Sequence, residues 1–221
     1  MKVIDGTRVQ IKICGLSRPE DIRAVNELKP DYAGFVFFEK SKRNISFEKA
    51  KELLALLNPD IRSAAVCVSP TPDFLKKAAG YGFDIIQIHG EIMPEVFDRL
   101  QTPVWQAVNL KKSIQSDDAI AHLICRHPNI CGYVVDGADY GGGKTFGWED
   151  DADLGTSAAG MIRHALDGRQ FILAGGLNVE NVQTGIRLFH PDVVDVSSGV
   201  ELGNYKDRDL MEQFISRVRE L

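Results

Sequence analysis

The sequence predicts an α/β protein, a (β/α)8 TIM barrel built as one domain over residues 1–221. Three observations lead to this prediction. Short apolar stretches alternate eight times with stretches of helical spacing, which favours parallel strands joined by right-handed helical crossovers. The apolar stretches are rich in Val and Ile, as strands buried on both faces are. Polar residues gather at the carboxyl ends of these stretches, where the active sites of such barrels lie.

Each strand is expected at a short run of β-branched and aromatic residues that ends in a turn or a polar residue. The eight predicted strands are Val9–Cys14, Tyr32–Phe38, Arg62–Val68, Asp84–His89, Val104–Asn109, Gly132–Asp136, Phe171–Ala174 and Val193–Val196.

The predicted helices fill the gaps between the strands. They are Pro19–Leu28, Phe47–Leu57, Pro72–Ala79, Pro94–Leu100, Asp117–Arg126, Ser157–Leu166, Val179–Phe189 and Asp207–Val218. Ser46, Thr71 and Asn178 supply helix start signals. Residues 1–8 form a lead before the first strand. Residues 137–155 form a long glycine-rich loop after the sixth strand, and a loop of that length in a compact domain is usually functional.

Composition narrows the class of protein. The net charge of −5 argues against nucleic acid as a partner, because nucleic acid attracts basic faces. No apolar run approaches the roughly 20 residues of a membrane span, and the amino terminus lacks a signal-peptide segment. The four cysteines show no metal-type spacing, so reduced thiols in a cytoplasmic protein are expected. His89-Gly90-Glu91 is similar to part of a zinc deaminase signature, but no cysteine pair follows, so no metal is predicted.

Side-chain alternation predicts which residues point into the barrel. On the first strand Ile11 and Ile13 should face the helices, so Lys12 and Cys14 face the interior. The same parity places further polar residues inside, namely Gln87, His89, Asp136, Asp195 and Ser197. Because a charge inside a barrel is costly unless paired, Lys12 is expected to pair with Asp195 on the neighbouring last strand.

Cys14 and Asp136 end the first and sixth predicted strands and would face each other across the mouth. A thiol and a carboxylate in this arrangement suit a general base and a general acid acting on a substrate held between them. The alternative for Cys14 is a small buried hydrophobe, and for Asp136 a turn-forming residue.

Glycine-rich loops follow the last two predicted strands, where barrels of this kind often bind a phosphate with backbone N–H groups. The predicted phosphate-binding residues are Gly175, Gly176, Ser197, Ser198 and Gly199, with two ordinary turns as the alternative. In the basic loop 38–44, Arg43 has the planar fork that suits a substrate carboxylate, with a solvated loop as the alternative.

The segment 138–145 nearly spells a nucleotide-binding P-loop, although alanine stands in place of the first glycine. A true P-loop runs directly into a helix, whereas a glycine and an acidic run follow here. A glycine-rich flap over the mouth is therefore predicted instead of a nucleotide site.

Several motifs together resemble those of the phosphoribosylanthranilate isomerase family, and they run in order from about Val9 to the carboxyl terminus. They are Lys12-Ile13-Cys14-Gly15-Leu16, Gly34-Phe35-Val36-Phe37, Ser41-Lys42-Arg43, Gln87-Ile88-His89-Gly90, Gly142-Gly143-Lys144-Thr145-Phe146, Ala174-Gly175-Gly176-Leu177-Asn178 and Asp195-Val196-Ser197-Ser198-Gly199-Val200-Glu201. The resemblance implies an eight-fold barrel and a step of tryptophan biosynthesis that needs no cofactor. In that step N-(5′-phosphoribosyl)anthranilate becomes an open-chain deoxyribulose phosphate by an Amadori rearrangement.

The resemblance also implies residue roles. Cys14 matches the base that takes the ribose C2′ proton, Asp136 the acid that protonates the ring oxygen, and Arg43 the group that grips the anthranilate carboxylate. Gly176 and Ser197 lie in the matching phosphate loops, and the other substrate-binding residues are Gln87, His89 and Asp195.

The flap at 140–148 departs from the family pattern. It is one residue shorter and has glycine at 147 where the family has aspartate. The competing functions are another sugar-phosphate isomerase or epimerase on the same barrel, which Cys14 and Arg43 disfavour, and a catalytically silent sugar-phosphate binding protein. The expected partner is a small-molecule substrate, and both a monomer and a homodimer are compatible with the sequence.

Overall fold

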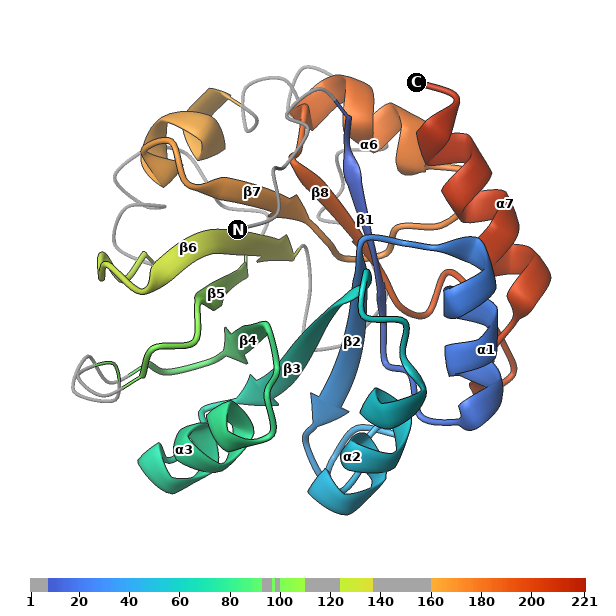
Figure 1. The fold of residues 1–221 in the computed structure, drawn as a ribbon. Helices are drawn as coiled ribbons and strands as arrows, with labels where there is room; N and C mark the ends of the chain where they lie inside the picture. Colours follow the sequence, from blue (N-terminus) through green and yellow to red (C-terminus); the bar gives the residue numbers. More distant parts are fainter. Residues whose placement is uncertain (1–7, 93–96, 98–99, 110–123, 137–159) are drawn as a thin grey trace.

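The computed structural model describes residues 8–92, 97, 100–109, 124–136 and 160–221, and its eight parallel strands close into a barrel (Figure 1). Each strand pairs with the next one along the chain, and the first pairs with the eighth. The strands are β1 (Gln10–Cys14), β2 (Tyr32–Phe37), β3 (Arg62–Val68), β4 (Ile85–His89), β5 (Val104–Asn109), β6 (Ile130–Asp136), β7 (Gln170–Leu173) and β8 (Val193–Val196). The predicted fold class is confirmed.

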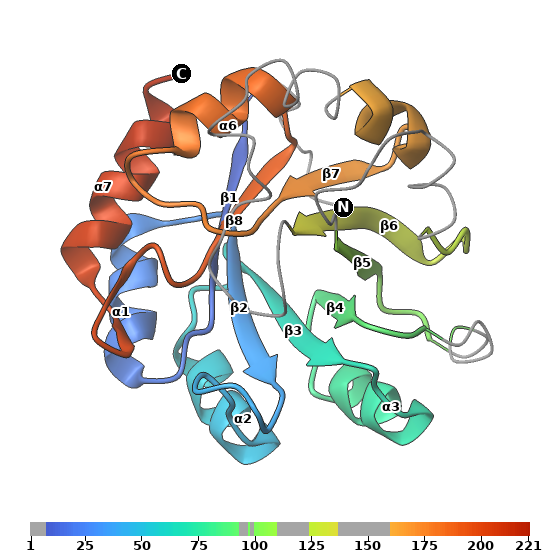
Figure 2. The ribbon, with the colours of Figure 1, turned by 180° about the vertical axis from the view of Figure 1, so that it is seen from behind.

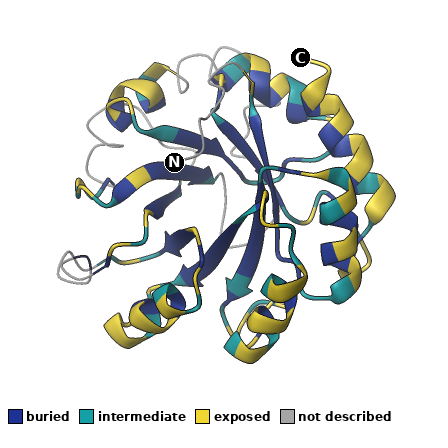
Figure 3. Ribbon diagram, in the orientation of Figure 1, coloured by how far each residue is buried: buried dark blue, intermediate teal, exposed yellow. Residues whose placement is uncertain are grey.

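Helices cover the outside of this barrel, as both ribbon views show (Figures 1 and 2). They are α1 (Pro19–Leu28), α2 (Phe47–Leu56), α3 (Pro72–Gly80), α6 (Val182–Phe189) and α7 (Arg208–Arg219), and residues 160–166 are also helical. Ser46 and Thr71 cap α2 and α3 as predicted, because their hydroxyl oxygens accept hydrogen bonds from the first-turn N–H groups. The helices turn buried faces to the strands and exposed faces outward (Figure 3).

Apart from shifts of one or two residues at the ends of elements, the described residues differ from the prediction at three places. Helix α6 begins at Val182, because the Asn178 side chain accepts hydrogen bonds from the N–H groups of Glu180 and Asn181 and holds residues 179–181 in a turn. Residues 124–126, predicted to end a helix, are irregular. A short hairpin of β9 (Glu201–Leu202) and β10 (Tyr205–Lys206) follows β8 and was not predicted.

Several predicted segments lie outside the described residues. These are nearly all of the amino-terminal lead, most of the helices predicted at Pro94–Leu100 and Asp117–Arg126, the start of the helix predicted at Ser157–Leu166, and the loop 137–155 with its P-loop-like and flap segments. In the described part of the chain, no helix has both the length and the apolarity to cross a membrane. All four cysteines are in that part and carry free thiols.

The core has two layers. The larger lies between the strands and the helices, and the smaller fills the barrel itself. Its side chains are Tyr32, Ala64, Ile85, Trp105, Ala107, Val134, Ile172, Ala174 and Val193. The rings of Tyr32 and Trp105 pack edge to face with centroids 4.8 Å apart. The barrel is therefore a packed core below its mouth, as the fold requires.

A polar cluster closes the amino-terminal end of the barrel. The side-chain oxygen of Gln10 accepts hydrogen bonds from Tyr32, Arg62 and Gln170, each 3.2 Å long. The guanidinium of Arg62 also lies 3.9 Å from the centroid of the Tyr32 ring, a cation–π distance. Gln10 and Tyr32 are buried at this end, and the cavity described below opens at the other end, where the strands terminate.

Candidate active site

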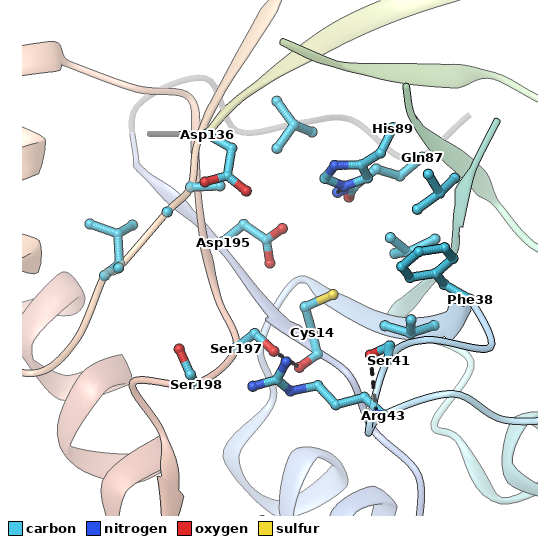
Figure 4. Close-up of a pocket in the computed structure, with 18 of the residues that line it drawn as sticks. Cys14, Phe38, Ser41, Arg43, Gln87, His89, Asp136, Asp195, Ser197 and Ser198 are labelled. Carbon is cyan, nitrogen blue, oxygen red and sulfur yellow. Dashed lines mark hydrogen bonds between the residues drawn. The ribbon is translucent and has the colours of Figure 1, made fainter. Parts of the chain in front are cut away.

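A cavity of about 450 Å³ opens at the carboxyl ends of the strands. All the predicted site residues line it except Gly199, and Figure 4 shows how they converge from β1, β4, β6 and the loops after β2 and β8. The mouth of the barrel thus brings together residues that are up to 184 positions apart, from Cys14 to Ser198.

Cys14 is the last residue of β1 and Asp136 the last of β6, and their side chains enter the cavity from facing sides (Figure 4). The backbone around Cys14 is fixed by hydrogen bonds. The Ser197 hydroxyl donates to the Cys14 carbonyl at 3.0 Å, and the N–H groups of Gly15 and Leu16 both donate to the carbonyl of Gly34. A side chain whose main chain is held in this way keeps its position when a ligand binds.

The absence of a side chain on Gly34 leaves space for the Cys14 thiol. The two residues are paired in register across β1 and β2. A Cβ atom on Gly34 would lie 2.9 Å from Cys14 Sγ and 3.1 Å from Lys12 Cε, which is closer than side-chain carbons come to their neighbours. The glycine is therefore required by close approach of the thiol, whatever its backbone angles.

Lys12 and Asp195 form the predicted ion pair inside the barrel, with 2.6 Å between Nζ and Oδ2 and both side chains buried. Burial raises the pKa of the Cys14 thiol above its ordinary value, and the charge of Asp195 adds to this, whereas the charges of Lys12 and Lys206 oppose it. The two ammonium groups thus reduce the cost of forming a thiolate in a buried position, and the thiolate is the form that acts as a base.

Gln87 and His89 line the far side of the cavity on β4. Their Nε2 atoms lie 2.9 Å apart. Burial, together with the charge of Lys12, lowers the pKa of His89 to about 4, so the imidazole is neutral at pH 7. The buried oxygens Gln87 Oε1 and Asp195 Oδ1 have no hydrogen-bond partner within the described part of the chain. Such acceptors suit the hydroxyl groups of a sugar.

The loops after β7 and β8 form one surface. Gly175 and Gly176 both have positive φ, 84° and 68°, a conformation that glycine adopts without strain. Asn178 and Gly199 form a parallel bridge between the loops, and a side chain on Gly199 would collide with the Leu177 carbonyl. Gly199 therefore joins the two loops although it does not line the cavity. A paired glycine loop before a helix is the kind of surface that binds a phosphate through backbone N–H groups.

Arg43 lines the cavity, but its guanidinium is already held by Glu201, for which no role was predicted. Glu201 accepts hydrogen bonds from Arg43 Nε at 2.6 Å and Nη2 at 2.8 Å. Lys206 Nζ is 2.7 Å from the same carboxylate. The sequence signal for this cluster was the place of Glu201 at the end of the motif Asp195–Glu201, for which no role of Glu201 was predicted. The partners come from the unpredicted hairpin, so the pairing itself was not visible.

Among the residues that the structure describes, no group of three or more His, Cys, Asp or Glu side chains is placed to hold a metal ion.

Proteins of one family are similar to this chain along almost its whole length. A family model described as N-(5′-phosphoribosyl)anthranilate (PRA) isomerase matches residues 11–217. The N-(5′-phosphoribosyl)anthranilate isomerase of Thermoanaerobacter sp. (strain X514) is 40% identical over 217 residues, which cover 96% of this chain and 98% of that protein.

Solved structures agree. The phosphoribosyl anthranilate isomerase of Thermotoga maritima superposes with a TM-score of 0.81 and 31% identity, over 96% of this chain and 100% of that one. A phosphoribosyl anthranilate isomerase in complex with reduced 1-(o-carboxyphenylamino)-1-deoxyribulose 5-phosphate superposes with a TM-score of 0.77 and 30% identity, over the same shares of the two chains. The chain belongs to the N-(5′-phosphoribosyl)anthranilate isomerase family.

Proposed function

We propose that this protein isomerises N-(5′-phosphoribosyl)anthranilate to 1-(2-carboxyphenylamino)-1-deoxyribulose 5-phosphate, an aldose–ketose isomerisation of tryptophan synthesis. The observation that carries the proposal is the pair of Cys14 and Asp136 at facing sides of one cavity, between a guanidinium and two glycine-rich loops. The substrate has a carboxylate at one end, a phosphate at the other and a ribose between them, so each part has a chemically matched partner in the cavity.

Asp136 is the general acid in this proposal. Its carboxyl group donates a proton to the ring oxygen of the ribose, the C1′–oxygen bond breaks, and the anthranilate nitrogen supplies the electron pair that forms an iminium. Protonating the leaving oxygen makes this step possible at neutral pH, because an alkoxide is a poor leaving group.

Cys14 is the general base. Its thiolate removes the C2′ proton next to the iminium carbon, and the electron pair forms an enolamine. Ketonisation then places a proton on C1′ and leaves the carbonyl at C2′. Lys12 and Lys206 support this step because their positive charges favour the thiolate.

The remaining cavity residues bind. In this proposal Arg43 pairs with the aryl carboxylate, and backbone N–H groups near Gly175, Gly176, Ser197 and Ser198 bind the phosphate. The buried acceptors on Gln87 and Asp195, with His89 beside them, lie where they can bind ribose hydroxyls.

The direct test mixes the protein with freshly prepared N-(5′-phosphoribosyl)anthranilate and follows the loss of substrate fluorescence. Wild type is expected to turn the substrate over. Cys14→Ser should lose at least about 10²-fold in kcat, because a hydroxyl is a far weaker base near neutral pH. Asp136→Asn should lose at least as much, because an amide cannot supply the proton. Absence of turnover by a folded wild type refutes the proposed function, and a kcat for Cys14→Ser above a tenth of wild type removes Cys14 from the mechanism.

A further inference from the structure

The pairing of Arg43 with Glu201 uses only one edge of the guanidinium. The carboxylate contacts Nε and Nη2, which form the side edge of the planar group. A guanidinium has five N–H donors arranged as two forks, and the second fork is made by Nη1 and Nη2 at its end. Once Glu201 holds the side edge, the rotation of the whole plane is fixed, and with it the direction in which the end fork points.

Glu201 is itself held from two sides. Its side chain is 3% exposed, and Lys206 Nζ lies 2.7 Å from Oε1 while Lys42 Nζ lies 3.4 Å from Oε2. Glu201 and Lys206 are register partners in the hairpin of β9 and β10. Lys206 also donates to the carbonyl of Ser197 at 2.9 Å. The hairpin therefore ties the carboxylate to the loop that follows β8.

The Arg43 side chain is also fixed along its aliphatic part. Gly15, with a φ of 84°, lies beneath it, and a methyl group on Gly15 would collide with Arg43 Cδ. The Arg43 backbone N–H donates to the Ser41 hydroxyl at 3.1 Å (Figure 4). Both ends of the residue are therefore held before any ligand binds, which reduces the ordering cost of binding.

The charges of Arg43, Lys206 and Glu201 do not cancel. Arg43 and Lys206 bring two buried positive charges, and Glu201 brings one negative charge. Burial alone would raise the pKa of Glu201, but the hydrogen bond from Arg43 and the contacts of Lys206 outweigh it and lower the pKa to about 2. The carboxylate is therefore ionised at pH 7, and it offsets only one of the two buried positive charges, with the half-exposed ammonium of Lys42 adding a further positive charge at the same wall. Buried charge is costly unless paired, so a ligand anion at this wall is favoured.

We propose that Glu201 is a positioning residue that aims the end fork of Arg43 at the aryl carboxylate of the substrate. Glu201 contacts no substrate atom in this proposal and acts only through the guanidinium. Lys206 fixes Glu201 and balances its charge. The identity of the carboxylate rests on the proposed function.

The experiment compares two substrates that differ only in this carboxylate. One is N-(5′-phosphoribosyl)anthranilate, and the other is the matching phosphoribosyl compound made from ribose 5-phosphate and aniline. Wild type should prefer the first, because only it offers an anion to Arg43. Glu201→Gln should raise KM for the anthranilate compound roughly ten-fold with kcat changed less than about three-fold, since one charge-assisted contact is misaimed. For the aniline compound, kcat/KM should change less than about two-fold, because the guanidinium has no partner there.

Two further variants make the result decisive. Glu27→Gln is the matched control, because Glu27 forms the same kind of paired contact with Arg208 on the exposed outside of the barrel. It should leave both substrates unaffected. Glu201→Asp keeps the charge but shortens the side chain, so it should fold like wild type and still lose preference for the anthranilate compound.

The proposal is overturned if Glu201→Gln and Glu201→Asp lower kcat/KM equally for both substrates, because a purely structural residue would have that effect. It is also overturned if neither variant changes the ratio of kcat/KM between the two substrates. Failure of the proposed function is a separate result, because wild type would then turn over neither compound.

Discussion

Gly34→Ala should disable the active site while leaving the barrel folded. The new methyl group would lie 2.9 Å from Cys14 Sγ, whereas ordinary contacts are 3.4–4 Å. The thiol must therefore move by at least about 0.5 Å. It cannot move together with its strand, because β1 is hydrogen-bonded to β2 on one side and to β8 on the other.

The size of the effect follows from these distances. A displacement of about 1 Å at a reacting group costs roughly 10²-fold in rate, so a shift of half that size or more should lower kcat roughly 10- to 100-fold. Crowding by one methyl group in a packed interior costs about 1–3 kcal/mol of unfolding free energy. Because alanine restricts the unfolded chain more than glycine does, about 0.4–1 kcal/mol of that loss is recovered. The variant should therefore remain folded at 25 °C.

The assay measures kcat from the loss of substrate fluorescence and unfolding free energy from urea titration, for three matched variants. Gly132→Ala also crowds the barrel interior, with its methyl 2.9 Å from atoms of Ile172 and Trp105, but it lies away from Cys14. It should lose stability and keep its kcat. Gly80→Ala meets no atom within 4 Å, so it should keep its kcat and gain about 0.4–1 kcal/mol of unfolding free energy from the restricted unfolded chain. The reasoning is refuted if Gly34→Ala keeps kcat within about three-fold of wild type, or if Gly132→Ala loses as much kcat as Gly34→Ala does.

Three further outcomes are expected. Arg43→Ala should raise KM roughly 10- to 100-fold, and Arg43→Lys should recover only part of the loss because an ammonium lacks the planar fork; an unchanged KM at fixed salt would show that the loop is only a solvated surface. Inorganic phosphate should compete with substrate at roughly millimolar concentration by binding near Gly176 and Ser197. Purely non-competitive inhibition, or no inhibition at roughly tens of millimolar phosphate, would count against the phosphate site. The pKa of Glu201 is about 2 in the folded protein, below its ordinary 4.5, so its contribution to stability is present above pH 4.5 and is lost as the pH falls toward 2. At about 1.4 kcal/mol per pKa unit this is on the order of 3 kcal/mol, so urea titrations between pH 7 and pH 2 should show a smaller acid loss for Glu201→Gln than for wild type, and equal losses would contradict the assignment.

The sequence predicted those parts of the molecule that depend on local patterns. Two rules were sufficient to place Lys12 beside Asp195. Side-chain alternation points both residues into the barrel, and closure of the barrel makes the first and last strands neighbours. The start of α2 at Ser46 followed from a capping rule that acts within one turn. Asn178 was misplaced as a helix start because its side chain can satisfy either a helix or a tight turn, and here it holds the turn after the Gly175–Gly176 loop.

The contacts of the cavity wall could not be predicted in the same way. Whether Arg43 pairs with Glu201 or faces solvent depends on a two-stranded hairpin only six residues long, from 201 to 206. Strands of two residues leave almost no periodicity to read. The space that Gly34 leaves for Cys14 depends on the register between two strands, and that register is set by the whole barrel.

The polar cluster around Gln10 at the amino-terminal end affects where a ligand can enter and leave the cavity. In the described part of the chain, the fully buried rings of Tyr32 and Trp105 fill the interior next to this cluster, so the cavity has a packed floor. A ligand that enters at the mouth must leave through the same opening, so each product must depart before the next substrate can arrive. Mutations around Gln10 should therefore change the stability of the fold without changing kcat.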